Sequence, residues 1–185
     1  VYRDIGLVFN NESNLRVVTV SKDNKNIKDS ENIRFYPQIS SKISYPLIRQ
    51  SKQVTQTISP IIIPILAPYN NYTLQKDITE SNIFSLNRAS SITEWEGGPR
   101  INYGIEWFLN NDNGSDAKLL VGQTYRVNKN SSDTSEEMSD YFISSNVTLN
   151  KKNNINNSFI IDRKDIDVKS INMNTYFKFD QLKFA

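Results

Sequence analysis

Residues 82–109 read NIFSLNRASSITEWEGGPRINYGIEWFL, and residues 117–127, beyond a polar turn, read AKLLVGQTYRV. Both segments alternate with period two. The apolar positions are Ile101, Tyr103, Ile105, Trp107 and Leu109, then Ala117, Leu119, Val121, Tyr125 and Val127. Two amphipathic strands of about ten residues joined by a tight turn match a membrane-spanning β-hairpin. A soluble hairpin has the same alternation, so the period alone leaves both readings open.

The composition narrows the class of protein. Of 185 residues, 37% are hydrophobic, and the mean hydropathy is −0.54, which is low for a helical membrane protein and ordinary for a barrel with half-polar strands. The most apolar segment, residues 61–67, is bounded or interrupted by Pro60, Pro64 and Pro68, so no transmembrane helix is predicted. Acids and bases are interspersed at a net charge of +2, which argues against a nucleic-acid partner. The chain has no Cys and no His, which excludes disulfides, thiol nucleophiles, His triads and Cys or His metal sites.

Strand-like segments recur along the whole chain, and none favours a helix. We predict strands at residues 1–9, 14–21, 33–47, 55–67, 100–109, 117–127, 140–149, 155–163, 167–177 and 181–184. Short polar connections (10–13, 49–54, 110–115 and 151–154) alternate with longer ones (22–32, 68–99 and 128–139). Outer-membrane barrels have this signature of short periplasmic turns and long extracellular loops. Both ends are strand-like, so we expect a fragment of a longer protein, with exposed terminal strands.

The fold class predicted is therefore all-β: an antiparallel meander that forms part of a large transmembrane β-barrel, here an open curved sheet, with one long loop folded inward. On the lipid side we expect Ile101, Tyr103, Ile105, Trp107, Val121, Tyr141, Ile143 and Val147. The lumen lining should include Asn102, Glu106, Lys118, Thr124 and Arg126, with Ser144 and Asn146. Residues 55–67 fit less well, because both faces are apolar and Pro60 and Pro64 each remove a ladder donor. An irregular strand with a bulge is favoured there over a deliberately weakened pairing.

The long connection, residues 68–99, is expected to fold over the lumen as a cap. The loop has too many apolar residues to be a flexible segment surrounded by water, and its polar residues would be costly to bury in lipid. The apolar set is Ile83, Phe84, Leu86, Ile92 and Trp95, and the polar set is Asn82, Asn87, Arg88 and Glu96. Gly97 and Gly98 would allow a sharp entry into the strand that starts near Arg100.

Charged side chains in this region allow two readings each. Glu94 and Glu96 could pair as acid and base in a glycosidase, but solvated or lumen-facing charges are favoured. Arg88, Arg100 and Arg126 could contact lipid phosphates by charge-assisted hydrogen bonds. Pairing with interior carboxylates such as Glu96 or Glu106 is the favoured alternative.

The central block resembles the barrel domain of the LPS-assembly outer-membrane family LptD (also called OstA or Imp), in the form found in alphaproteobacteria. The resemblance covers residues 34–179 at varying strength, beginning with RFYPQISSKISYPL at 34–47. The absence of Cys departs from those family members that need disulfides. The residues that carry the resemblance are Asn82, Phe84, Ser85, Leu86, Asn87, Arg88, Glu96, Gly97, Gly98, Arg100, Asn102, Tyr103, Gly104, Gly122, Gln123, Tyr125 and Arg126.

The resemblance implies transport without covalent catalysis and without a cofactor or metal. Lipopolysaccharide would arrive over a periplasmic bridge through a domain absent from this segment. Its acyl chains would enter the bilayer laterally while its sugars cross the lumen. The implied partners are lipopolysaccharide, a plug lipoprotein of the LptE type, the periplasmic bridge and outer-membrane lipids, in the outer membrane of a Gram-negative cell. Two alternatives remain: a soluble all-β carbohydrate-binding or adhesive domain, and a porin-like barrel of another family.

Overall fold

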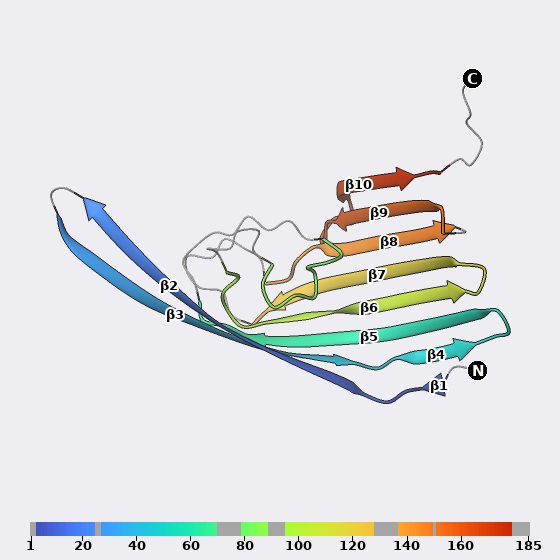
Figure 1. Ribbon diagram of the computed structural model, residues 1–185, viewed down its shortest axis with the longest axis horizontal. Coiled ribbons are helices and arrows are strands. Elements are labelled where there is room, and N and C mark those ends of the chain that lie inside the picture. Colours follow the sequence, from blue (N-terminus) through green and yellow to red (C-terminus); the bar gives the residue numbers. More distant parts are fainter. Residues whose placement is uncertain are drawn as a thin grey trace, which may run out of the picture.

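The computed structural model shows one antiparallel β-sheet (Figure 1). It describes residues 3–24, 27–69, 79–88, 95–127, 137–149 and 151–178. Within these ranges no helix is long and apolar enough to cross a membrane.

Among the described residues ten strands make up the sheet, and neighbours in the chain are mostly neighbours in space. The strands are β1 (Arg3–Asp4), β2 (Val8–Asn24), β3 (Ile27–Ser44), β4 (Leu47–Gln50), β5 (Val54–Leu66), β6 (Arg100–Asn111), β7 (Ser115–Arg126), β8 (Tyr141–Leu149), β9 (Asn153–Ile161) and β10 (Val168–Tyr176). The sheet runs β1-β4-β5-β6-β7-β8-β9-β10, and β3 pairs with both β2 and β5. The sheet is open along this path, so the antiparallel meander is confirmed.

The amino-terminal part differs from the prediction in its strand bounds and in two connections. The strand predicted at residues 1–9 is divided between β1 and β2, and the one predicted at 33–47 between β3 and β4. Residues 10–13 do not form a turn: they lie inside the single strand β2, with Asn10 opposite Lys42 and Ser13 opposite Ile39. Most of residues 22–32, predicted as a long link, belong to the ends of β2 and β3. Pairing explains both, because a neighbouring strand satisfies the backbone of polar residues that in isolation favour turns. Figure 1 shows β2 and β3 continuing as a two-stranded ribbon beyond the other strands.

The carboxy-terminal end is only partly described. The strand predicted at residues 181–184 lies outside the described residues. At the amino-terminal edge of the sheet the two residues of β1 pair with β4. At the other edge all nine residues of β10 are exposed, and the strand pairs with β9 alone among the described strands.

The proline-containing strand β5 is regular, so the predicted bulge is wrong. Its register with β6 is unbroken from Val54–Asn111 to Ile65–Arg100. Its pairing with β3 and β4 keeps one register but skips the positions opposite Pro60 and Pro64. Proline has no backbone N–H. A strand therefore tolerates proline where that N–H would point toward a neighbouring strand that forms no ladder hydrogen bond at that position. Both prolines therefore turn their missing donor away from β6.

The two faces of the sheet differ in what lies on them. One face, called here the covered face, carries residues 79–88 and 95–97 of the long loop, which pack on it as expected for an inward-folding loop. The other, the open face, carries no described segment and exposes large hydrophobic side chains. Among these are Phe35, Ile39, Ile62, Leu66, Ile105, Leu119, Tyr125, Tyr141, Ile171 and Met173.

Candidate functional site: a loop packed on the covered face

Ile83 and Phe84 of the loop sit over a pair of glycines in the sheet. Gly104 of β6 faces Gly122 of β7. A Cβ atom on Gly104 would lie 2.8 Å from Cζ of Phe84, and one on Gly122 would lie 3.0 Å from Cγ1 of Ile83. Only the missing side chains allow the loop to approach this closely. Ile83 is fully buried and joins Leu120 and Phe142 in an apolar cluster.

A second apolar cluster explains why β5 is hydrophobic on both faces. Ile61, Ile63 and Ile65 are buried against Leu86 of the loop, with Phe84 packed beside them. Ile62 and Leu66, which alternate with them, lie on the open face and are exposed. β5 thus has apolar side chains on both faces of the sheet, and among the described residues only those on the covered face are packed against another segment of this chain.

A single buried carboxylate organises the polar part of the loop. Glu96 is fully buried, and the guanidinium of Arg88 donates to both of its oxygens, from Nε at 2.7 Å and from Nη2 to Oε1. This fork-to-fork arrangement fixes the orientation of both planar groups. Arg88 also donates from Nη1 to the hydroxyl of Thr124 on β7 at 2.6 Å, so the pair is tied to the sheet.

Two arginines of the sheet converge on the same glutamate. Arg126 Nη2 donates to Glu96 Oε1 at 3.0 Å, and Arg100 Nη2 lies 3.5 Å from Glu96 Oε2. Arg100 also donates to backbone oxygens, those of Glu96 at 3.1 Å and of Leu86. The prediction that Arg88, Arg100 and Arg126 pair with Glu96 is confirmed. These three cations are buried around one anion, and leaving a charge buried without its partner is costly. Glu96 is therefore the hub of the loop, while Glu94 lies outside the described residues.

Further contacts fasten the loop to strands that are distant in sequence. Gln38 of β3 donates from Nε2 to the backbone oxygen of Glu96 at 3.1 Å. The ring of Tyr36 packs on Trp95 with centroids 3.5 Å apart. Asn87 Oδ1 accepts from the backbone N–H of Glu96 at 2.9 Å, which closes the loop on itself. Sequence reasoning missed Gln38 and Tyr36; their only signal was their place on the polar face of their strand.

The other residues of the central block have separate places. Asn82 Oδ1 accepts from the N–H of Thr79 at 2.8 Å and shapes a local turn. Gly97 is half-buried beside Gly98, which has φ +82°, a conformation that glycine adopts without strain. Ser85 donates its hydroxyl to the backbone oxygen of Ser81 at 3.2 Å.

Three residues of the block lie on the open face and do not touch the loop cluster. Tyr103 donates its hydroxyl to Oε1 of Gln123, and Gln123 Nε2 donates to the backbone oxygen of Ser139 at 2.8 Å. Tyr125 is partly exposed on the same face. The block therefore contributes to both faces of the hairpin formed by β6 and β7.

The five residues predicted to line a lumen share the covered face but separate into two groups. Asn102, Thr124 and Arg126 are buried beneath the loop, where Asn102 Oδ1 accepts from the Thr124 hydroxyl at 3.0 Å. Lys118 and Glu106 lie closer to the short turns and stay partly exposed. Lys118 Nζ is 2.9 Å from Glu80 of the loop and 3.9 Å from Glu106.

Together these contacts between loop and sheet hold the loop in place, and they are called here the lock. Its ion pairs are already satisfied within the chain, and within the described ranges no group of acidic residues could hold a metal ion. In a comparison with known protein families, the model for LPS transport system D, LptD, matches residues 12–185. The chain belongs to this family. None of the curated proteins compared with the chain matches it significantly.

Membership in LptD assigns the chain a general role in the transport and assembly of lipopolysaccharide. The match spans most of β2, all of β3 to β10 and the loop, so the lock between loop and sheet lies within the LptD region. The residues of the lock are thus features of a transport structure that handles an amphiphilic lipid.

Proposed function

We propose that this chain forms part of the wall of the outer-membrane translocon that places lipopolysaccharide in the outer leaflet. One observation carries the proposal: the open face is apolar across the sheet, while the opposite face is mostly polar or covered by the loop, with Phe108 as an exposed exception. The apolar open-face residues continue from β3 to β10, through Ile39, Ile62, Ile105, Leu119, Tyr141 and Ile171. A contiguous apolar surface of this extent marks contact with lipid or another protein.

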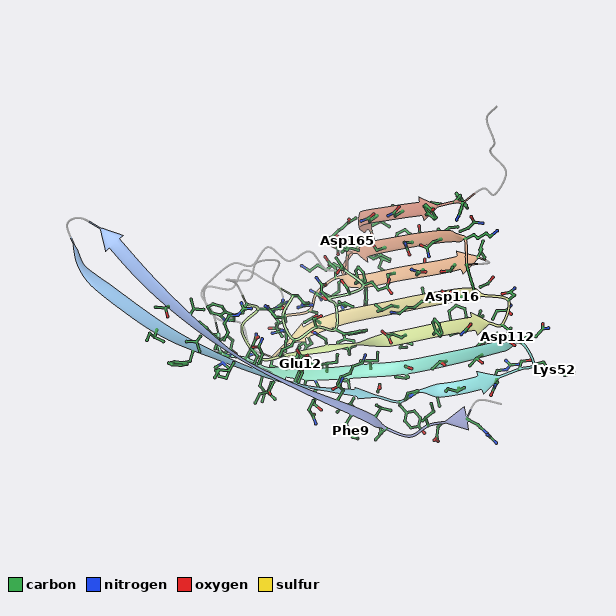
Figure 2. The ribbon with its side chains drawn as sticks, viewed as in Figure 1. Phe9, Glu12, Lys52, Asp112, Asp116 and Asp165 are labelled. Carbon is green, nitrogen blue, oxygen red and sulfur yellow. The ribbon has the colours of Figure 1, made fainter. Side chains whose placement is uncertain are left out.

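Strand length and charge placement support contact with lipid. The strands from β5 to β10 have nine to 13 residues, and a tilted strand needs about 9–11 to cross the apolar layer. Figure 2 shows Lys52, Asp112 and Asp116 gathered at the end of the sheet where the short turns lie. Charged residues at the margin of an apolar band suit the interface between membrane and water.

In this proposal the loop caps the lumen and the covered face lines the sugar path. The partners are those of an LptD barrel: lipopolysaccharide, a plug lipoprotein of the LptE type, and a periplasmic bridge reached through a domain that these residues do not contain. The role is passage and positioning, without covalent catalysis. The outer membrane of a Gram-negative cell is the proposed location.

The rival reading, a soluble carbohydrate-binding or adhesive domain, has to leave this apolar face in water. Ile105, Leu66 and Phe35 are each more than half exposed, at 51%, 67% and 63%. Isolated exposed hydrophobic residues are normal, but a continuous surface promotes aggregation unless lipid or protein covers it. A porin-like barrel of another family would share the surface, and the LptD match argues against it.

A pair of arginine substitutions tests the proposal. Ile105→Arg on the open face of β6 should destabilise the inserted barrel by about 2–4 kcal/mol if it lies near the middle of the membrane. Ser158→Arg on the covered face of β9 is the matched control and should be mild, because the Ser158 side chain lines a cavity of about 540 Å³ that has room for a longer polar side chain. The measurement is the fraction of heat-modifiable, folded protein in outer membranes. Equal tolerance of the two substitutions contradicts a lipid-facing surface, as does a soluble monomeric protein that unfolds cooperatively without detergent.

A further inference from the structure

The covered face is divided into a charged half and an uncharged half. On β6 and β7 it carries the arginine cluster around Glu96, together with Glu106, Lys118 and Asp116. On β8, β9 and β10 the covered positions are Asn, Ser, Thr, Tyr and two apolar residues. They are Phe142, Ser144, Asn146, Thr148, Asn154, Asn156, Ser158, Ile160, Ser170, Asn172, Asn174 and Tyr176. Amide and hydroxyl groups dominate this half, and none of these positions is charged.

A cavity of about 540 Å³ lies on the uncharged half, beside the start of the loop. Its size is within the range of small-ligand sites. The walls come from Ser144 of β8, Ser158 of β9 and Asn172 and Asn174 of β10, closed on one side by Thr79 and Glu80. The side chain of Ile160 provides an apolar patch at the edge of this polar surface.

One buried hydroxyl in the cavity wall has no partner among the described residues. Ser144 is 2% exposed, and its buried hydroxyl oxygen has no hydrogen-bond partner. Within the described part of the chain Ser158 makes no side-chain hydrogen bond, and neither do Ser170, Asn172 and Asn174, which are exposed on β10 and open to a ligand. Buried polar groups are normally satisfied, so an orphan hydroxyl in a cavity wall indicates that something else completes it.

Neighbouring amides are already held in a fixed orientation. Asn154 Nδ2 donates to Asn146 Oδ1 and to the Thr148 hydroxyl, both at 3.1 Å, and Asn156 Nδ2 donates to Asn154 Oδ1 at 2.6 Å. Asn156, whose Nδ2 is engaged in this chain of hydrogen bonds, lines the cavity. A rigid polar surface loses less entropy when it orders a ligand than a mobile one.

We propose that this cavity binds an uncharged saccharide and discriminates against phosphorylated sugars. Sugar hydroxyls both donate and accept, which matches a wall of amides and hydroxyls, and a sugar C–H face can pack on Ile160. A phosphate would find no cation among the lining residues and would meet the carboxylate of Glu80, whose charge Lys118 balances from outside the cavity. The inference rests on the proposed function and adds to it which part of the glycolipid this half of the face receives.

The test is a binding titration with the protein purified from outer membranes into detergent. The probes are maltohexaose and maltohexaose phosphorylated at one end. Their binding is measured by saturation-transfer NMR. We expect weak binding of the neutral probe and weaker binding of the phosphorylated one. Ser144→Ala should raise the dissociation constant about fivefold through loss of one hydrogen bond, while leaving stability unchanged or higher because it removes an orphan group. The Asn172→Ala, Asn174→Ala double variant should weaken binding about tenfold or more.

Asn110→Ala is the matched control, because Asn110 lies on the same face of β6 but outside the cavity, and it should bind as the parent protein does. No binding of the neutral probe, equal binding by parent and double variant, or preference for the phosphorylated probe each overturns the inference. Folding and membrane insertion are measured in parallel by heat-modifiable migration. If the unsubstituted chain does not insert into the membrane, the proposed function is wrong. If it inserts but binds no sugar, only the inference about this cavity is wrong.

Discussion

Gly104 and Gly122 face each other across β6 and β7, and the ring of Phe84 lies over both. The two positions are not equally tight. A Cβ on Gly104 would come within 2.1 Å of the backbone oxygen of Val121, whereas one on Gly122 would meet only side chains, at 3.0 Å and beyond. Backbone cannot move aside as a side chain can, so a side chain at position 104 would disturb the pairing of β6 with β7 as well as the packing of the loop.

Alanine at Gly104 should therefore be far more damaging than alanine at Gly122. We expect Gly104→Ala to cost about 1–3 kcal/mol through overpacking, and Gly122→Ala to cost less, because Ile83 and Phe84 can shift. The measurement is the heat needed to convert folded to unfolded barrel in electrophoresis, combined with protease sensitivity of the loop. Equal effects of the two substitutions would show that the close approach of the Val121 backbone oxygen does not set the cost at position 104.

Removing the charge of Glu96 should unfasten the loop. Glu96→Gln leaves Arg88, Arg100 and Arg126 buried together without an anion, which should cost about 3–5 kcal/mol. The control is Glu106→Gln, since Glu106 is partly exposed and 3.9 Å from Lys118, a geometry that contributes little. Proteolysis between residues 79 and 99 should become fast in Glu96→Gln alone. Protection of the loop in that variant would mean that apolar packing holds it without the ion pairs.

Deleting the loop tests whether it is a cap. Without residues 82–96 we expect the strands to stay paired, while the outer membrane becomes permeable to large antibiotics. The deletion bares the buried faces of Ile61, Ile63 and Ile65, so a lower folding yield should accompany the leak. The measurement is antibiotic susceptibility alongside the amount of folded protein. If assembly fails with no leaky intermediate, the loop is a folding element rather than a cap.

The turn between β9 and β10 should respond to acid. A hydrogen bond from Lys169, together with the backbone N–H groups of Lys164 and Asp165, lowers the pKa of Asp162 from 3.8 to about 2. A carboxyl with a depressed folded pKa stabilises the turn above its unfolded pKa, and this contribution is lost as pH falls from about 4 to about 2. Carboxyl-carbon NMR should give the low midpoint, and Lys169→Met should move the midpoint upward. A midpoint that Lys169→Met leaves unchanged would show that the backbone donors alone set the pKa.

Part of this structure could be read from the sequence because its signals are local. Strict alternation with a polar Asn-Gly turn is enough to place β6 and β7, since a period of two leaves one register that keeps apolar residues on one face. The inward-folding loop also followed from composition, because Phe84, Leu86 and Trp95 beside Arg88 and Glu96 suit neither water nor lipid. Local signals misled at residues 10–13, where polarity suggested a turn and pairing with β3 made a strand.

The sequence by itself determined the strand periodicity, the position of the loop and the kinds of charge in it. The tertiary structure decided which charges meet: Glu96 receives Arg88 from the loop, Arg100 from β6 and Arg126 from β7, and Gln38 reaches it from β3, 58 residues away. It also explains why β5 is apolar on both faces: one face packs against Leu86 of the loop, and the other belongs to the open face. The physical reason is that alternation fixes the face on which a side chain lies, whereas burial and ion pairing depend on what packs against that face, and this is set by residues distant in the chain.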